Sequence, residues 1–242
     1  MRRTKTTWLI LAGVVSIMVL SVTVFQDGKG LATAQQPPRQ TNTEISELTD
    51  RYPVAPFDEA EPSDPVKRAK LKQRKQRYDK DAPFTQPGPD DGEVAFLPEW
   101  QFDFPALPVA KSDVIVIGEV LNAEAHRSEN KQNVFSNFEV RVDEVLKGTN
   151  LSAGNVINVQ RIGGFVNYPN GQKVLFRLAG NGMPAVGYRY AFFLNVLDDD
   201  YRILTGYELG PQGVMPLDYS RQFEDHKGQN EADFLKALRA AI

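Results

Sequence analysis

Alternation of apolar and polar residues is the strongest pattern in the second half of the chain. Large apolar residues recur at every second position at Tyr188, Tyr190, Phe192, Leu194 and Val196, and similar patterns occur over 134–142, 174–178 and 201–207. A period of two is typical of a strand with one buried face. The stretch 113–121 is instead continuously apolar and β-branched near its start, which predicts a strand buried on both faces. Two more strands are expected, at 156–162 and 214–217.

The last residues follow a helical pattern instead. Asn230 is a good N-cap, and an apolar stripe follows it, formed by Phe234, Leu235, Leu238 and Ile242. Turn signals separate the strands, and no strand–helix–strand rhythm occurs. The pattern therefore predicts a mostly β domain over 93–242, a small antiparallel barrel or sandwich, with a C-terminal helix over 230–242.

The longest apolar run lies near the other end. Trp8 to Phe25 carries no charge and follows Arg2, Arg3 and Lys5. As a helix this run spans about 27 Å, close to the thickness of a bilayer's hydrocarbon core. Basic residues stay on the cytoplasmic side, so the rest of the chain is expected outside the cytoplasm.

Two interpretations of residues 1–34 remain open. Ala32, Thr33 and Ala34 fit a signal-peptidase site, which would release a secreted or periplasmic protein after cleavage near Ala34. The apolar run is longer than an ordinary signal core, which favours an uncleaved anchor with its N-terminus inside and its C-terminus outside. In that second case the membrane is a partner through Trp8–Phe25.

Residues 35–92 are rich in proline and charge. Such a segment buries too little apolar surface to offset the entropy of ordering, so we expect a disordered stalk. One island inside it, 65–80, has Ser63 or Asp64 as a cap and Pro65 at the first helical position, which predicts a basic helix. Its cations are candidates for binding an anionic surface: Lys67, Arg68, Lys70, Lys72, Arg74, Lys75, Arg77 and Lys80.

Composition narrows the chemistry. The chain has no cysteine and only 2 histidines, so disulfides, thiolate catalysis and cysteine-based metal sites are excluded, and we expect no cofactor and no metal. A net charge of −3 gives no reason to expect nucleic acid as a partner. His126 is expected in a polar loop, and Asp198, Asp199 and Asp200 are expected to form an acidic hairpin turn rather than a calcium site.

Three segments carry a resemblance to a known layout. They are the strand 112–120, the turn Val142-Asp143-Glu144-Val145-Leu146-Lys147-Gly148 and the strand 187–194. Their order resembles uncharacterised bacterial exported domains and is distantly similar to the netrin-like and metalloproteinase-inhibitor OB-fold barrels, over residues 110–217. The resemblance implies an OB-like barrel. It does not imply protease inhibition, because those inhibitors use an N-terminal cysteine.

OB-type barrels bind ligands across one face and its flanking loops. The glycine-rich segments near 163–164 and 180–187 therefore give the candidate ligand residues, which are Arg161, Phe165, Asn167, Tyr168 and Arg189. No catalytic residue stands out, since neither a nucleophile elbow nor a zinc-protease helix motif occurs.

The function that we expect is a non-enzymatic binding module of the cell envelope, exported or tethered to the membrane, with an envelope protein or a glycan as its partner. Two alternatives remain. One is an envelope hydrolase that uses barrel carboxylates, and the other is adhesion to an anionic surface through the basic stalk segment.

Overall fold

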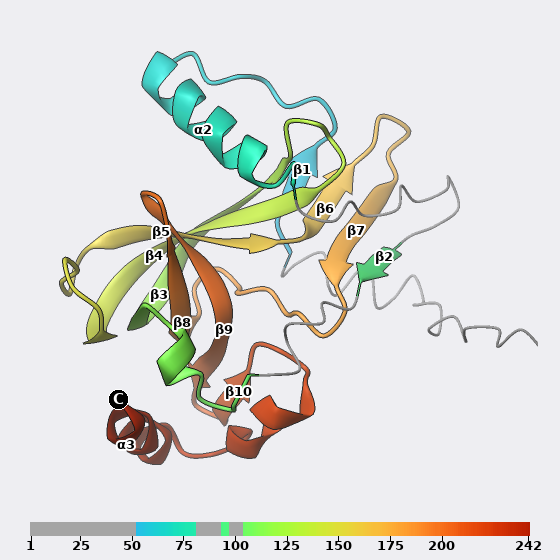
Figure 1. Cartoon of the computed structure of the whole chain (residues 1–242). Coiled ribbons are helices and arrows are strands. Elements are labelled where there is room, and N and C mark those ends of the chain that lie inside the picture. Colours follow the sequence, from blue (N-terminus) through green and yellow to red (C-terminus); the bar gives the residue numbers. More distant parts are fainter. Residues whose placement is uncertain (1–51, 81–92, 97–103) are drawn as a thin grey trace, which may run out of the picture. The chain divides into compact units, whose positions relative to one another are not determined.

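The predicted strands and the C-terminal helix are present in the computed structural model, which describes residues 52–80, 93–96 and 104–242 (Figure 1). All of these residues belong to one unit, Arg39–Ile242. The strands are β1 (Val54–Pro56), β2 (Glu93–Phe96), β3 (Val114–Arg127), β4 (Val134–Lys147), β5 (Val156–Ile162), β6 (Gly164–Asn167), β7 (Lys173–Leu178), β8 (Arg189–Leu197), β9 (Asp200–Gly210) and β10 (Gly213–Pro216). The helices are α2 (Pro65–Arg77), α3 (Glu231–Ala241) and the 3₁₀ turns η2 (Val109–Lys111) and η3 (Arg221–His226).

Six strands form the larger sheet, in the order β10-β9-β5-β4-β3-β8, and β9 also pairs with β8. The pairings therefore lead from β3 through β4, β5, β9 and β8 back to β3. The step between β5 and β9 is parallel and joins only Val159 to Tyr201 and Gln160 to Arg202. Because this step is so short, the barrel is not closed by a full ladder of hydrogen bonds.

The smaller sheet has the order β1-β6-β7-β2. The chain passes from β5 of the larger sheet to β6 of the smaller sheet at Gly163. The φ of this residue is 111°, which suits glycine, and a Cβ here would lie 2.8 Å from the carbonyl oxygen of Phe176. The β1–β6 and β2–β7 pairs are parallel. The expectation of an antiparallel domain over 93–242 was therefore wrong for β2–β7 and β5–β9, and β1 adds a parallel pair from outside that range. Segments distant in sequence add to strand edges that local turns do not define.

The first half of β3 is buried on both faces, as its continuous apolar run predicted, whereas Leu121, Asn122 and Glu124 further along the strand are exposed. Val114 and Val116 pack inside the strand circuit, in a core shared with Phe138, Val140 and Phe192. Ile115 and Ile117 point to the other face and join a second core. The sheet therefore has apolar material on both sides at this strand.

Helix α3 covers the second core. The Asn230 side chain caps it by accepting a hydrogen bond from the backbone N–H of Ala232 at 2.9 Å, and Phe234, Leu235 and Leu238 are buried. Ile242, the last member of the predicted stripe, is 49% exposed. The helix thus packs on the outer side of β3, β8 and β9 through three of the four expected residues.

The expectation of a disordered stalk was wrong for residues 52–80, which form a strand and a helix. Val54, Ala55 and Pro56 form β1 against β6, and the predicted basic helix is present as α2 with Asp64 as its N-cap. Composition gave a wrong expectation here because it describes the segment as a whole. Individual residues within 52–80 pair with β6 or contact the larger sheet. The other parts of the stalk, 35–51 and 81–92, and residues 1–34 lie outside the described residues.

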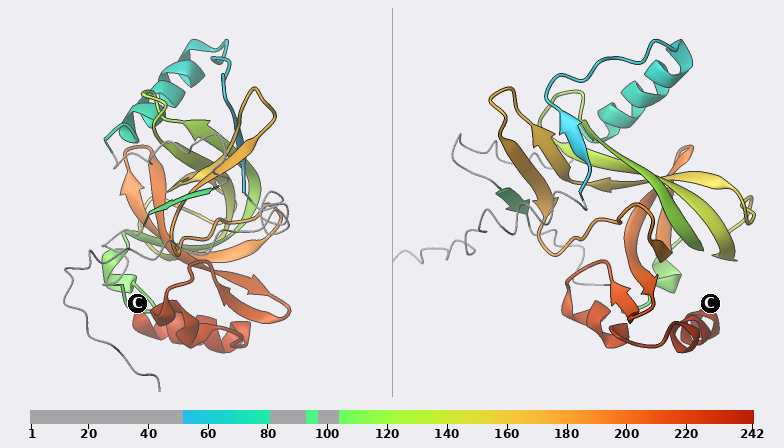
Figure 2. Two further views of the ribbon diagram at one scale, coloured as in Figure 1. Left: turned by 90° about the vertical axis from the view of Figure 1, so that its right-hand side faces the viewer. Right: turned by 180° about the vertical axis from the view of Figure 1, so that it is seen from behind.

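The two helices lie at opposite ends of the larger sheet, and they are held differently (Figures 1 and 2). Helix α3 presents an apolar face, whereas α2 has no buried residue of its own. We therefore expect α3 to depend on apolar packing and α2 on polar contacts.

Replacing Phe234 by alanine should lower the free energy of unfolding by about 3–5 kcal/mol, because a fully buried ring is lost from the second core. The matched control Ile242→Ala, on the same helix but exposed, should change it by less than about 0.5 kcal/mol. Urea unfolding followed by circular dichroism measures both. Equal shifts for the two variants would contradict this account of α3.

Candidate binding face under helix α2

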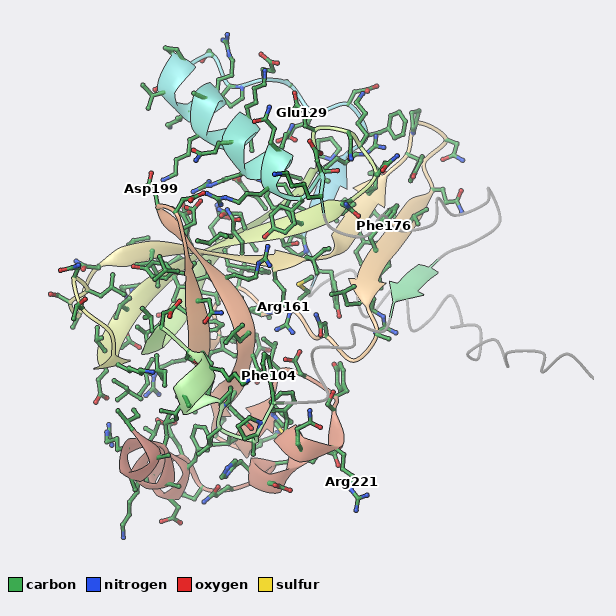
Figure 3. The ribbon with its side chains drawn as sticks, in the orientation of Figure 1. Phe104, Glu129, Arg161, Phe176, Asp199 and Arg221 are labelled. Carbon is green, nitrogen blue, oxygen red and sulfur yellow. The ribbon has the colours of Figure 1, made fainter. Side chains whose placement is uncertain are left out.

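The turn between β8 and β9 presents carboxylates beside α2. Asp198 adopts a positive φ of 53° in this tight turn, and Asp200 begins β9. Figure 3 shows Asp199 at the tip of the turn, pointing toward α2. The Asp200 side chain has no exposed surface, whereas Asp198 is 59% exposed. The predicted acidic hairpin turn is confirmed, and one of its carboxylates is enclosed.

Arginine side chains from α2 pair with the enclosed carboxylate. Arg74 donates from Nε to Asp200 Oδ2 at 2.9 Å and from Nη2 to Asp200 Oδ1 at 2.6 Å, a bidentate contact. Arg77 donates from Nη1 to Asp200 Oδ2 at 3.2 Å and from Nε to Asp198 Oδ2 at 3.1 Å. Lys70 Nζ lies 3.8 Å from Asp200 Oδ1. The carboxylate is thus surrounded by cations.

The charge on Asp200 is stabilised by these contacts. Burial by itself raises the pKa of a carboxyl, but the hydrogen bonds and charges of Arg74, Arg77 and Lys70 outweigh it, so the pKa of Asp200 is lowered. Asp200 therefore remains ionised beneath the helix, and its pairing with α2 is a charged contact.

An aromatic stack extends the contact beyond the ion pairs. Tyr78 follows α2, is 1% exposed and stacks on Phe135 of β4, with 4.4 Å between ring centroids and 9° between ring planes. Its hydroxyl donates to Gln160 Oε1 at 3.3 Å, and Gln160 donates in turn from Nε2 to Asp200 Oδ2 at 3.2 Å. Phe135, Gln160 and Asp200 therefore form one continuous surface on β4, β5 and β9.

The loop between β3 and β4 binds Tyr78 and Asp79, which directly follow α2. We call residues 65–80 the α2 segment. Asn133 donates from Nδ2 to the carbonyl oxygen of Tyr78 at 2.6 Å, and the backbone N–H of Asn130 donates to Asp79 Oδ1 at 2.9 Å. We call the surface made by Phe135, Asn133, Gln160, Asp198 and Asp200 the α2 face.

A second polar cluster lies beside α2. Glu59 Oε1 is 2.7 Å from His126 Nδ1, and Glu59 Oε2 is 2.7 Å from Lys75 Nζ. Burial raises the pKa of Glu59, but the contacts with His126 and Lys75 outweigh this and lower it. His126 lies at the end of β3 and is 7% exposed, so the expected solvated loop position was wrong. A cavity of about 250 Å³, small for a ligand pocket, adjoins Glu59 and Lys75.

Most of the candidate anionic-surface residues form ion pairs with carboxylates of the same chain. Arg74, Lys75 and Arg77 are 12%, 18% and 13% exposed. Arg68 pairs with Glu61 at 3.4 Å. The remaining lysines, Lys67, Lys72 and Lys80, are exposed. Arg74, Lys75 and Arg77 of α2 therefore face the sheet and its loops, and the capacity of the helix to bind an anionic surface stays a prediction.

The candidate ligand residues lie in different environments. Arg161 is 2% exposed and forms an ion pair with the buried Asp218, and Phe165 is fully buried in the core. Asn167 ends β6 and is exposed, and the Tyr168 ring lies 5.1 Å from that of Phe57. Arg189 begins β8 and donates to Glu231 at 2.9 Å. No contact brings all five together, and ligand binding by them stays a prediction.

The side chains of the Arg161–Asp218 pair are 2% and 0% exposed. Burial raises the pKa of Asp218, and the Arg161 guanidinium opposes that shift. The backbone N–H of Gly182 donates to Asp218 Oδ1 at 3.2 Å. The pair thus ties β5 to the glycine-rich loop, which gives Arg161 a structural explanation.

Sequence reasoning did not identify Glu59, Tyr78 and Asp200 as functional residues. A signal was present, because the basic island 65–80 and the acidic turn 198–200 have opposite charge, but nothing local says that they meet. Tyr78, the single aromatic residue of that island, was the second signal.

The described residues contain neither a recognisable metal site nor a membrane-spanning helix. The described residues contain no group of 3 or more His, Asp or Glu side chains arranged to hold a metal ion. None of the described helices has the length and apolar character needed to cross a membrane. The predicted span Trp8–Phe25 lies outside them. No protein-family model matches the chain, and no curated protein matches it significantly.

Replacing Asp200 by asparagine should lower the free energy of unfolding by about 1.5–3 kcal/mol, since hydrogen bonds to a charged group are lost and Arg74 keeps an unmatched charge. Asp199→Asn makes the same chemical change at an exposed neighbour and should cost less than about 0.5 kcal/mol. Chemical denaturation at neutral pH compares the two. Similar losses would show that Asp200 does not hold α2.

The contribution of Asp200 should depend on pH in one direction. Its folded-state pKa is below the usual 3.8, so its stabilisation is fully present above that value and is lost as pH falls through the lowered pKa. The stability difference between the wild type and Asp200→Asn should therefore shrink on acidification below about pH 3.8. Denaturation curves at a series of pH values measure this, and a constant difference would contradict it.

Proposed function

We propose that this protein is a non-enzymatic binding module of the cell envelope, exported or tethered through Trp8–Phe25. The observation that carries the binding role is the occupied α2 face, which holds a segment of the chain by ion pairs, an aromatic stack and flanking loops. The export part is supported by the charge-free apolar run behind a basic N-terminus.

We further propose that β3, β4, β5, β8 and β9 make an OB-like barrel. The order of strand pairing and the parallel step from β5 to β9 support this. In OB-folds, a partly open five-stranded barrel, ligands bind on the face of the second and third strands and the adjoining loops. In this chain those strands correspond to β4 and β5, where Phe135 and Gln160 contact the α2 segment.

The two alternative functions fit the geometry less well. Asp200 and Asp218 are each bound by arginine, so neither is a free carboxylate for a hydrolase. While α2 is docked, adhesion to an anionic surface would have only the exposed Lys67, Lys72 and Lys80, because Arg74 and Arg77 bind Asp200.

The location can be tested with the full chain carrying a C-terminal tag in its source cell. Fractionation should recover it in the membrane or outside the cytoplasm, and deletion of residues 8–25 should leave it in the cytosol. The N-terminal residue of the recovered protein separates the two forms, Gln35 after cleavage and an intact N-terminal segment for an anchor. Recovery of the full-length chain as a soluble cytosolic protein would refute the export proposal.

A further inference from the structure

The α2 segment is bound on the barrel in the way that a separate ligand would be. Helix α2 itself contains no buried residue, and its cations contact the sheet through ion pairs. The Tyr78 ring that follows it is 1% exposed and stacks on Phe135. The segment thus adds one buried ring, and its other contacts join charged or polar groups, which allows it to separate while the strands stay folded.

The opposite surface belongs to the barrel itself. Phe135 and Gln160 lie on β4 and β5, which pair in regular antiparallel register from Phe135–Ile162 to Arg141–Val156. Asp200 begins β9, which pairs with β8 over its length. These strands hold the α2 face in place independently of α2, so the face is preorganised for a binder.

The chemistry of the α2 face selects its binder. Asp200 accepts two hydrogen bonds from one guanidinium, and a second arginine one helical turn later bridges Asp200 and Asp198. A planar guanidinium matches such a carboxylate, whereas a lysine offers a point charge. Phe135 then accepts an aromatic ring directly after the second arginine.

Resting on the proposed binding function, we infer that the α2 face binds an arginine-bearing helix of a partner protein, and that α2 is the intrachain competitor that covers it. The partner segment carries two arginines three residues apart followed by an aromatic residue, as Arg74, Arg77 and Tyr78 do. A tethered segment has a high effective concentration, so the face opens to a partner only when α2 is outcompeted or released.

The test uses the full chain in mild detergent and a fluorescein-labelled peptide of residues 62–80 as the probe. Wild-type protein should bind it weakly, because α2 occupies the face. The variant Arg74→Glu/Arg77→Glu releases α2 and should bind the peptide at least tenfold more tightly by fluorescence anisotropy. Adding Asp200→Asn to that variant should remove the gain.

The control Lys67→Glu/Lys72→Glu makes the same change in charge on the exposed lysines of α2 and should bind the peptide as the wild type does. A folded Arg74→Glu/Arg77→Glu variant that gains no peptide binding would overturn the inference. A wild-type dimer formed by exchange of α2, seen by light scattering, would overturn the assignment to a different partner protein.

Hydrogen exchange on the wild type keeps the test decisive if the double variant fails to fold. Amides of α2 should exchange through an opening that leaves β4 and β5 protected, and faster at high salt. Exchange of α2 only on global unfolding would make it a permanent part of the fold and overturn the inference. Failure of peptide binding leaves the fractionation result intact, and a cytosolic location leaves the peptide result intact, so the two proposals fail separately.

Discussion

The enclosed carboxylate of Asp200 sets the main constraint on this structure. A buried charge is costly unless it is paired and hydrogen-bonded, and among the described residues of the larger sheet the amide of Gln160 donates to it. The cations come from α2, more than a hundred residues earlier in the chain. With α2 in place Asp200 is enclosed, and the arginines of that helix supply the opposite charge that its burial requires.

The two helices α2 and α3 are attached to the larger sheet in different ways. Helix α3 buries Phe234, Leu235 and Leu238 and becomes part of a core, whereas α2 buries none of its residues. Apolar packing persists in salt, whereas an ion pair weakens with ionic strength to the extent that it is exposed, as the pair of Arg77 with Asp198 is. The same domain thus has one helix that belongs to its fold and one whose contact depends on conditions, and only the second covers the face on β4 and β5.

The cations of α2 also connect the proposed function to the envelope. Of the cations that we expected to bind an anionic surface, Arg74 and Arg77 bind Asp200 and Asp198, whereas Lys67, Lys72 and Lys80 are exposed. While α2 is docked on the sheet, only the exposed lysines would be accessible for the proposed adhesion.

The sequence by itself determined most strands of the larger sheet and the capped terminal helix, because side-chain period, N-cap chemistry and turn residues are local properties. Val114 to Ile117 even indicated a strand buried on both faces. The tertiary structure alone decided that β5 meets β9 in parallel, that β1 extends a sheet and that Arg74 meets Asp200. These contacts join residues far apart in the chain. They therefore stabilise the structure only when the fold has brought both partners together and out of water.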